Sequence, residues 1–235
     1  SGLLSTRAEA WTDTDNARCG VPACVFDPGF GYEQWIDYIL DVPMYFLHRG
    51  DDYIDVAGQS FRDYLASRLA GFEGMPPNMA DFEDHITIAF PEVRLKQFIE
   101  MRGADSGPWA NICALPALWV GILYDEDALA EAEALCAHIS ADDVMNARLS
   151  VATNGLNGQL AGEDVYQLAA RLVEIATSGL RRRGICDDGG NDETGFLQPL
   201  KTIIETRKTP AEVMLDLYRQ DWDGDIDQVF TANQY

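Results

Sequence analysis

The chain has 235 residues, of which 47% are hydrophobic and 24% charged, so it is long and apolar enough to bury a sizeable core. Its 39 acidic residues against 17 basic ones give a formal net charge of −22. A field of that sign repels nucleic-acid phosphates and acidic membrane surfaces, which argues against nucleic-acid binding. No apolar run is long enough to span a bilayer, so we expect no membrane partner.

The first part of the chain alternates loops with short elements. Residues 3–32 are rich in turn formers and are predicted to form loops around short extended pieces. Apolar residues at helical spacing follow, and this helix ends before Pro43. Two strands, 44–49 and 53–57, are then predicted on either side of a turn. A second helix is predicted over 60–69.

The next segment has the most informative pattern. Residues 71–85 are turn formers and acids, which predict a loop. Alternation of apolar residues begins at Ile86 and resumes after Pro91 over eleven residues, which predicts a strand with one apolar and one charged face. The charged face carries Glu92, Arg94, Lys96, Glu100 and Arg102. It is either a solvated ladder of charges or a surface that faces a ligand.

The remainder of the chain is predicted to be helical. The first helix is apolar nearly all round, so we expect it to be buried and kinked at Pro116. The helix predicted over 165–183 has three arginines in its last turn and Gly184 after it, a typical helix end. The predicted helices are 109–124, 125–139, 165–183, 196–206 and one that opens with a capping box at Thr209. The class is therefore α+β, with sheet and loops in residues 1–109 and mostly helices in residues 110–235.

Cysteine and histidine usage limits the kinds of site that are expected. The five cysteines are an odd number, with no CxxC motif and no signal peptide, which indicates a reducing cytosol and a cytoplasmic protein. The three histidines share no metal-ligand spacing. The acidic segment 221–228 lacks the glycine and the final acid of an EF-hand loop, so we interpret it as a surface turn.

Two segments carry candidate functional residues. Glu100 and Arg102 lie on one face of the predicted strand, about 6.5–7 Å apart. They can pair with each other, or together hold a metal-bound phosphate, with the carboxylate on Mg²⁺ and the guanidinium on phosphate oxygens. The loop WTDTDNAR sets carboxylates beside Arg18, either as Asx-turns or as a ligand-binding loop. Tyr38 and Tyr45 either line a small pocket or pack in the core.

Several long motifs in fixed order resemble glutamate–cysteine ligases of the plant and proteobacterial type. They are TRAEAWTDTDNARCG, DYILDVPMYF, GQSFRDYL, FPEVRLKQFIEMRGADSGPW and ICALPALWVGILYD. The resemblance covers essentially the whole chain, through to the TPAE helix. That family is similar to glutamine synthetase, so the resemblance implies part of an antiparallel β-cradle lined by Glu and Arg, followed by a helical layer.

The resemblance also implies a reaction and roles. The reaction joins the γ-carboxylate of L-glutamate to the amine of L-cysteine with ATP and Mg²⁺, through an acyl phosphate, as the first step of glutathione synthesis. Glu100 becomes a Mg²⁺ ligand and Arg102 a catalytic residue that binds phosphate or carboxylate. The other implied contacts are those of ATP or glutamate with Arg7 and Arg18, and of cysteine with Tyr38 and Tyr45.

The sequence departs from the family pattern in three respects. Ala110–Asn111 stands where a basic pair is usual, and Cys19 stands where a threonine is common. Family members carry a further N-terminal half, which supplies most of the metal-binding glutamates. The resemblance therefore implies that residues 1–235 are the C-terminal portion of the catalytic domain and are inactive without their partner, the missing half. The alternatives are a ligase with another amine acceptor, or a non-catalytic partner subunit or remnant.

Overall fold

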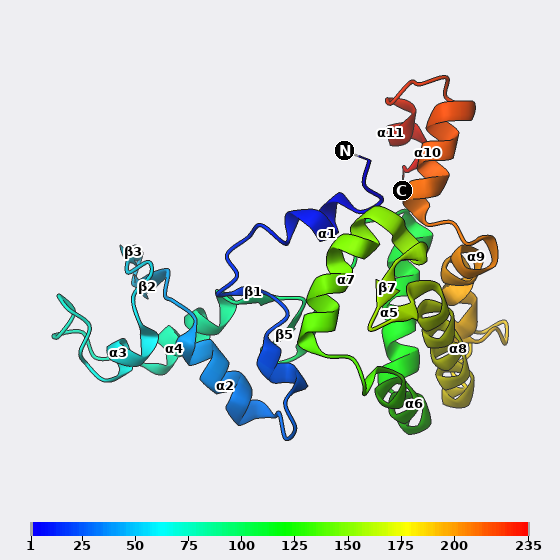
Figure 1. Cartoon of the computed structure of the whole chain (residues 1–235). Coiled ribbons are helices and arrows are strands. Elements are labelled where there is room, and N and C mark those ends of the chain that lie inside the picture. The colour runs from blue at the N-terminus through cyan, green and yellow to red at the C-terminus, as the bar shows by residue number, and fades with distance from the viewer. Residues whose placement is uncertain (1, 235) are drawn as a thin grey trace. The chain divides into compact units, whose positions relative to one another are not determined.

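The computed structural model describes residues 2–234, which form two compact units. The sheet unit consists of residues 10–103, and the helical unit consists of residues 2–9 together with residues 104–234. The chain enters the sheet unit after residue 9 and leaves it after residue 103 (Figure 1). Helices and short strands are both present, which confirms the α+β class. Among residues 2–234, no helix has both the length and the apolar composition needed to cross a bilayer.

The strands of the sheet unit are short and pair two by two. β1 pairs with β4 in parallel, whereas β2 with β3 and β5 with β6 form antiparallel hairpins. The strands are β1 (Cys19–Gly20), β2 (Phe46–Arg49), β3 (Asp52–Asp55), β4 (Phe90–Pro91), β5 (Val93–Leu95) and β6 (Ile99–Met101). The helices are η1 (Ala23–Phe26), α2 (Tyr32–Asp41), α3 (Phe61–Leu65) and α4 (Met79–Thr87). The helix before Pro43 and the β2–β3 hairpin are thereby confirmed, whereas the glutamine-synthetase-like cradle stays a prediction.

Helix α4 corrects the sequence-based expectation. We predicted a loop over 71–85 and a strand from Ile86, but residues 79–87 are helical. The cause is a capping box: the Asn78 side chain accepts from the Asp81 backbone N–H, and the Asp81 carboxylate accepts from the Asn78 N–H. Local capping therefore overrides the short alternation of apolar residues that suggested a strand.

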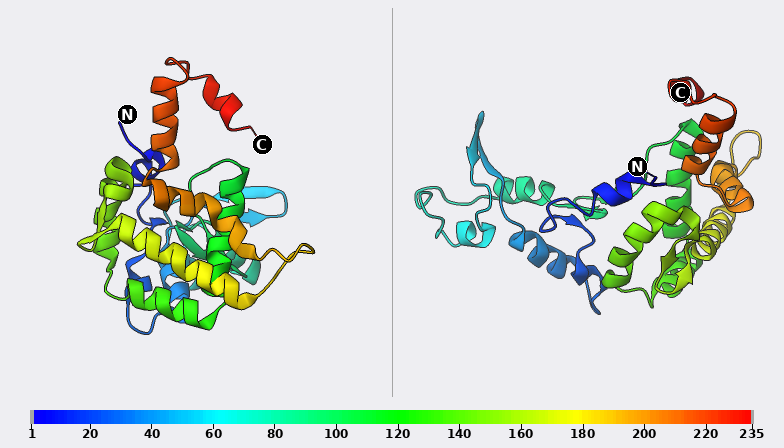
Figure 2. Two further views of the ribbon diagram at one scale, coloured as in Figure 1. Left: turned by 90° about the vertical axis from the view of Figure 1, so that its right-hand side faces the viewer. Right: turned by 45° about the horizontal axis from the view of Figure 1, so that its top comes forward.

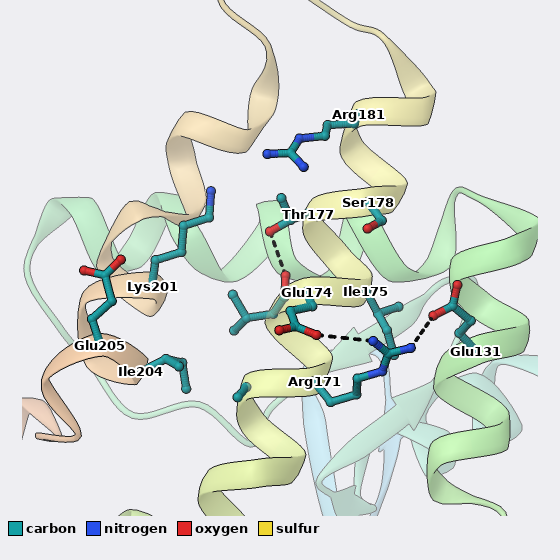
Figure 3. A pocket seen from close by; sticks show the side chains of 12 residues that line it. Glu131, Arg171, Glu174, Ile175, Thr177, Ser178, Arg181, Lys201, Ile204 and Glu205 are labelled. Carbon is teal, nitrogen blue, oxygen red and sulfur yellow. Dashed lines mark hydrogen bonds and ion pairs between the residues drawn. The ribbon is translucent and has the colours of Figure 1, made fainter.

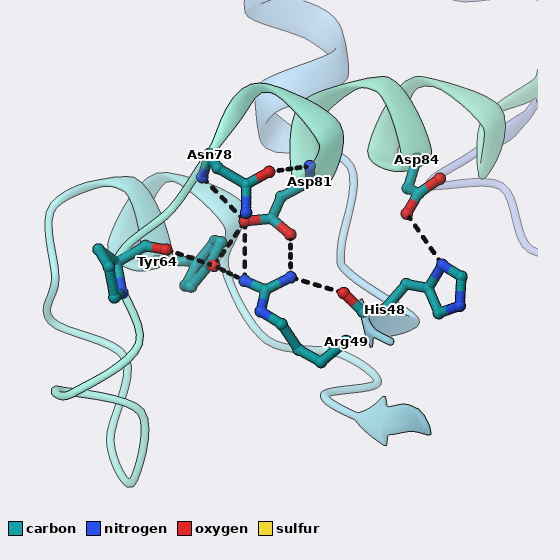
Figure 4. A network of polar contacts seen from close by, with 7 residues as sticks. His48, Arg49, Tyr64, Asn78, Asp81 and Asp84 are labelled. Carbon is teal, nitrogen blue, oxygen red and sulfur yellow. Dashed lines mark hydrogen bonds and ion pairs between the residues drawn. The ribbon is translucent and has the colours of Figure 1, made fainter. Parts of the chain in front are cut away.

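The carboxylate of Asp81 also joins three elements of the sheet unit (Figure 4). It accepts from both terminal nitrogens of Arg49 at the end of β2, at 2.9 Å for Nη2, and from the Tyr64 hydroxyl of α3 at 2.7 Å. Burial opposes ionisation, but the hydrogen bonds from Arg49, Tyr64 and the capping box outweigh it and lower the pKa of Asp81. An ion pair therefore ties β2 to the start of α4, and a hydrogen bond from Tyr64 ties α3 to the same carboxylate.

The predicted long strand is in fact the β5–β6 hairpin. The paired residues are Val93 with Met101, Arg94 with Glu100, and Leu95 with Ile99. The faces are also the reverse of the expectation, because Val93 is 48% and Ile99 58% exposed, whereas Arg94 is only 7% exposed. Arg94 is buried because its guanidinium donates to the carbonyls of Thr87 and Ala89, next to the end of α4. Each guanidinium nitrogen of Arg94 therefore keeps an acceptor although the side chain is buried.

The helical unit contains the remaining elements. Its helices are α1 (Thr6–Ala10, whose last residue opens the sheet unit), α5 (Trp109–Leu123), α6 (Glu126–Cys136), α7 (Ala141–Asn154), α8 (Val165–Arg183), α9 (Gln198–Thr206), α10 (Pro210–Gln220) and α11 (Gln228–Ala232). The short elements are η2 (Gly155–Asn157), η3 (Glu193–Leu197) and the hairpin of β7 (Gln159–Leu160) and β8 (Glu163–Asp164). The structure confirms Pro116 inside α5, the end of α8 at Gly184 with a φ of 64°, and the capping box at Thr209. The β7–β8 hairpin was not predicted.

The core of the helical unit is built around a close crossing of α5 and α8 (Figure 2). A Cβ atom added at Gly179 of α8 would lie 1.9 Å from the Gly121 carbonyl oxygen of α5, and one added at Gly121 would lie 2.3 Å from the Ala176 carbonyl oxygen. The two backbones are therefore nearly in contact. The buried side chains around the crossing are Ala117, Ile122, Ala128, Ala132, Ile175, Ala176, Leu180 and Leu197.

Candidate functional site

The loop before β1 is shaped by Asp15. Its carboxylate accepts from the Ala17 N–H at 3.1 Å, and its carbonyl accepts from the N–H groups of Arg18 and Cys19. Asp15 also accepts from Arg18 Nε at 2.5 Å. The hydrogen bond from Arg18 is the main reason why the pKa of Asp15 lies below its usual value. One residue thus both bends the loop and orients the Arg18 side chain.

The Arg18 guanidinium is buried and incompletely paired. The residue is 3% exposed, and its Cζ lies 3.7 Å from the centroid of the Tyr45 ring. Its Nη1 has no hydrogen-bond partner within residues 2–234. Buried donors in folded proteins are nearly always paired, and guanidinium nitrogens bind carboxylate and phosphate oxygens. Arg18 Nη1 is therefore a candidate donor to an anionic ligand.

A pocket of about 520 Å³ lies beside this loop. Asn16, Cys19 and residues 21–24 line it together with four residues of α2, which are Gln34, Asp37, Tyr38 and Asp41. Burial raises the pKa of Tyr38 to about 12, with smaller contributions from Cys24 and Cys19 and an opposing one from the Arg18 charge. The Tyr38 hydroxyl is therefore protonated at neutral pH and can donate a hydrogen bond into the pocket.

A charged cluster lies on the β5–β6 hairpin. Glu100 Oε2 accepts from Arg94 Nε at 2.7 Å and from Arg102 Nη1 at 3.2 Å. The hydrogen bond from Arg94 contributes most to lowering the pKa of Glu100, and Arg102 adds to it against desolvation. The cluster therefore combines one ionised carboxylate with two guanidiniums.

Backbone pairing brings the Arg18 loop and the hairpin together. The Phe90 N–H donates to the Arg18 carbonyl at 2.6 Å, and the Arg102 N–H donates to the Glu92 carbonyl at 2.8 Å. The Phe90 ring lies 5.9 Å from the Arg94 Cζ and 5.6 Å from the Arg102 Cζ. The two segments that carry the predicted site residues are thus neighbours within the sheet unit.

Five of the six predicted site residues belong to the sheet unit and one belongs to the helical unit. Arg7 lies on α1 in the helical unit. The five in the sheet unit are Arg18, Tyr38, Tyr45, Glu100 and Arg102. Arg18 contacts Tyr45, and Glu100 contacts Arg102. The ligand roles of all six stay predictions.

Two members of the site had no assigned role in the sequence analysis. Asp15 had a usable signal, because an Asp three residues before an Arg in a turn can both cap the turn and pair with the Arg. Arg94 had no such signal. Its acceptors are the carbonyls of Thr87 and Ala89, and these become available only where α4 ends.

The described residues supply only part of a metal site. Among residues 2–234, no three His, Cys, Asp or Glu side chains gather as the ligands of one ion. Mg²⁺ commonly takes one or two protein carboxylates and completes its shell with waters and substrate phosphates. Glu100 therefore fits as a single ligand of such a set, and its Oε2 already accepts from two guanidiniums.

Comparison with known protein families shows which family the chain belongs to. The model of a family described as "Glutamate-cysteine ligase family 2 (GCS2)" matches residues 1–232. The chain belongs to the glutamate–cysteine ligase family. The resemblance predicted from the five motifs is thus confirmed, and the members of this family are ligases.

Relatives from plants match over the whole chain. It is 46% identical over 235 residues to the chloroplastic glutamate–cysteine ligase of Nicotiana tabacum, of which it covers 44%. It is 44% identical over the same length to glutamate–cysteine ligase A, chloroplastic, of Oryza sativa subsp. indica, and covers 46% of it. The same identity holds for the chloroplastic enzyme of Arabidopsis thaliana, of which it covers 44%. The chain therefore spans less than half the length of these relatives.

The predicted cytoplasmic location is contradicted by these comparisons. The relatives in this glutamate–cysteine ligase family are named chloroplastic. The five cysteines are free thiols, as expected for a reducing environment. Free thiols do not indicate which reducing compartment holds the protein, and that is why the inference from cysteine usage was wrong.

Proposed function

We propose that the chain is part of an ATP- and Mg²⁺-dependent ligase that joins the γ-carboxylate of L-glutamate to the amine of L-cysteine through an acyl phosphate. The relatives at 44–46% identity support this, because each is named a glutamate–cysteine ligase. The observation that carries the proposal is the buried Arg18 with its unpaired Nη1. Glutamate and ATP both offer the anionic oxygens that such a nitrogen binds.

Arg18 binds a carboxylate or phosphate oxygen through Nη1. Asp15 fixes one edge of the guanidinium and the Tyr45 ring supports its face, so little side-chain entropy is lost when the ligand binds. A preorganised donor of this kind stabilises charge that develops during phosphoryl and acyl transfer. Tyr38, with its protonated hydroxyl, lines the pocket that receives cysteine.

The hairpin cluster binds the phosphates. Arg102 is 26% exposed at its side chain and binds phosphate oxygens, while Arg94 is fixed by its carbonyl acceptors and orients Glu100. Glu100 supplies one Mg²⁺ ligand. Mg²⁺, when bound, neutralises phosphate charge, and phosphoryl transfer depends mainly on such neutralisation and on positioning.

The 235 residues act as the C-terminal portion of the catalytic domain. The proposal assigns them one part of a glutamine-synthetase-like cradle, and the N-terminal half supplies the remaining metal ligands. The coverage of 44–46% of the relatives supports this division. Arg7 contacts ATP or glutamate once both parts are present. The chain alone is then inactive.

A chimera tests the proposal. Residues of the tobacco ligase that align with this chain are replaced by residues 1–235, and γ-glutamylcysteine formation from ATP, glutamate and cysteine is measured. We expect turnover by the chimera and none by the 235-residue chain alone. Arg102→Gln in the chimera should lower kcat/KM by about 10²-fold or more, whereas the matched Arg68→Gln, which removes an exposed ion pair with Asp63, should leave it unchanged.

Three outcomes would overturn the proposal in different places. Robust turnover by residues 1–235 alone refutes the division into halves. A folded chimera that consumes ATP only with another amine acceptor refutes cysteine as the substrate. A folded chimera without any ligation refutes a catalytic role for this chain, and would favour a non-catalytic partner subunit.

A further inference from the structure

A groove of about 580 Å³ lies on the helical unit, and none of the residues assigned to the ligase reaction is among those that line it (Figure 3). Helix α8 lines it along its length, with one residue from α6 and three from α9. Its volume falls within the range of small-molecule sites, roughly 300–1,000 Å³. The groove is therefore large enough for a metabolite.

Three acids line the groove, and two of them share one guanidinium, whereas Glu205 of α9 has no ion pair among residues 2–234. Arg171 donates to Glu131 at 3.0 Å and to Glu174 at 3.2 Å. The first bond joins α6 to α8, the second lies within α8, and both carboxylates thus face one guanidinium (Figure 3). An anion elsewhere in the groove consequently meets less repulsion than the number of acids in this chain suggests.

The opposite end of the groove is cationic. Arg181 of α8 and Lys201 of α9 extend their charged groups at the same end (Figure 3). Within the described residues 2–234, neither has a carboxylate within 4.0 Å. Lys201 Nζ reaches only the Thr194 carbonyl, at 3.4 Å. In a chain with 39 acids and 17 bases, two such cations that face one groove are unexpected.

Asp192, whose carboxylate feels the charge of both cations, does not form an ion pair with either of them. Asp192 accepts from the backbone N–H and the hydroxyl of Thr194. The hydrogen bond from the Thr194 hydroxyl is the main reason why the pKa of Asp192 is lowered, and the charges of Arg181 and Lys201 add to it. Both cations therefore act on the same carboxylate from a distance, which places them near each other without an ion pair.

We propose that this groove binds a small phosphomonoester. A phosphate monoester carries about −1.5 to −2 charges at pH 7, which matches one guanidinium and one ammonium, whereas a single carboxylate does not. Arg181 presents a planar fork to the phosphate oxygens and Lys201 a point charge. The Ser178 hydroxyl, one turn from Arg181 on the same wall, is a third donor. Ile175 and Ile204 line the groove where the organic part would lie.

The experiment uses the 235-residue chain labelled with ¹⁵N and titrated with glycerol 3-phosphate at low ionic strength, where charge pairing is least screened. Amide shifts locate the site and give Kd. We expect shifts at Ser178, Arg181 and Lys201. Arg181→Gln and, separately, Lys201→Gln should weaken binding by about tenfold or more each, since charge-assisted hydrogen bonds to phosphate are lost.

Matched controls separate the groove from general charge attraction. Arg219→Gln changes the net charge equally at an exposed position of α10 and should leave Kd within about twofold. Glycerol should cause no shifts, and inorganic phosphate should bind more weakly than the ester. Equal loss in Arg219→Gln, shifts confined to Arg18 and the β5–β6 hairpin, or equal affinity for inorganic phosphate would each overturn the proposal.

Discussion

Replacement of Gly179 by alanine should destabilise the helical unit, although alanine is the better helix former. In an isolated helix the change would favour folding by about 1 kcal/mol. In the structure, the added Cβ would lie roughly 1 Å inside the closest approach that such atoms make, against the Gly121 backbone. A backbone obstacle cannot change rotamer, so α8 has to move away from α5.

The size of the effect follows from what that movement costs. A gap of 0.5–1 Å forfeits roughly a quarter to a half of each dispersion contact across the interface. The side chains around the crossing, such as Ile122, Ile175 and Leu180, are at most 4% exposed, so the loss falls on a packed core. Overpacking of about 3 kcal/mol against a helical gain of about 1 kcal/mol leaves about 2 kcal/mol of net destabilisation. For a protein of this size the Tm should fall by roughly 4–8 °C.

Thermal unfolding followed by circular dichroism measures the change. The matched control is Gly195→Ala in η3, where an added Cβ would have no atom within 4 Å. We expect its Tm to stay the same or rise slightly. If Gly179→Ala behaves like this control or raises the Tm, the backbones of α5 and α8 do not approach as described.

Two further predictions concern the sheet unit. Burial lowers the pKa of His85 to about 4, so between pH 6.5 and 4 the unfolded chain takes up the proton first and stability falls. His85→Gln should remove roughly 2–3 kcal/mol of that acid-induced loss, measured by urea unfolding at pH 7 and 4.5, and the same pH dependence in both proteins would contradict it. Arg49→Met should cost about 3 kcal/mol, because it leaves the buried Asp81 without its counter-charge. Hydrogen exchange of α4 measures this, and a cost no larger than that of Arg68→Met, which breaks an exposed pair, would refute it.

In the helical unit, the sequence predicted those helix ends whose cause lies within a few residues of the end itself. The three arginines and Gly184 end α8 as expected, because a positive φ and the helix dipole act within one turn. The capping box at Thr209 is equally local. The close crossing at Gly121 was not predictable, since its cause is the backbone of a helix more than fifty residues away in sequence.

The β5–β6 hairpin shows why a correct pattern led to a wrong element. Residues 93 and 101 pair across a turn, as do 95 and 99, so the apolar positions share one face in a hairpin just as they do in one long strand. The alternation therefore could not distinguish the two. Nor could it reveal which face is buried, because that depends on Arg94 and the end of α4.

The Arg18 site was found in part for similar reasons. The loop sequence places an acid near Arg18, which signals a turn, and the structure adds the burial and the unpaired Nη1. The contact with Tyr45 joins the loop before β1 to a residue 27 positions later in the chain, which no local signal contains. The sequence singled out Arg18 and Tyr45 as candidates, whereas their contact with each other became visible only in the fold.

The contacts of Arg94 limit which amino acids can replace it without loss of stability. Its three guanidinium nitrogens serve one carboxylate and two carbonyls at once. Lysine keeps the charge but has one nitrogen on a flexible stem, so it cannot reproduce that planar fork. A scoring matrix would rate Arg94→Lys as mild, yet a genetic screen should find it among the poorly tolerated exchanges of the sheet unit.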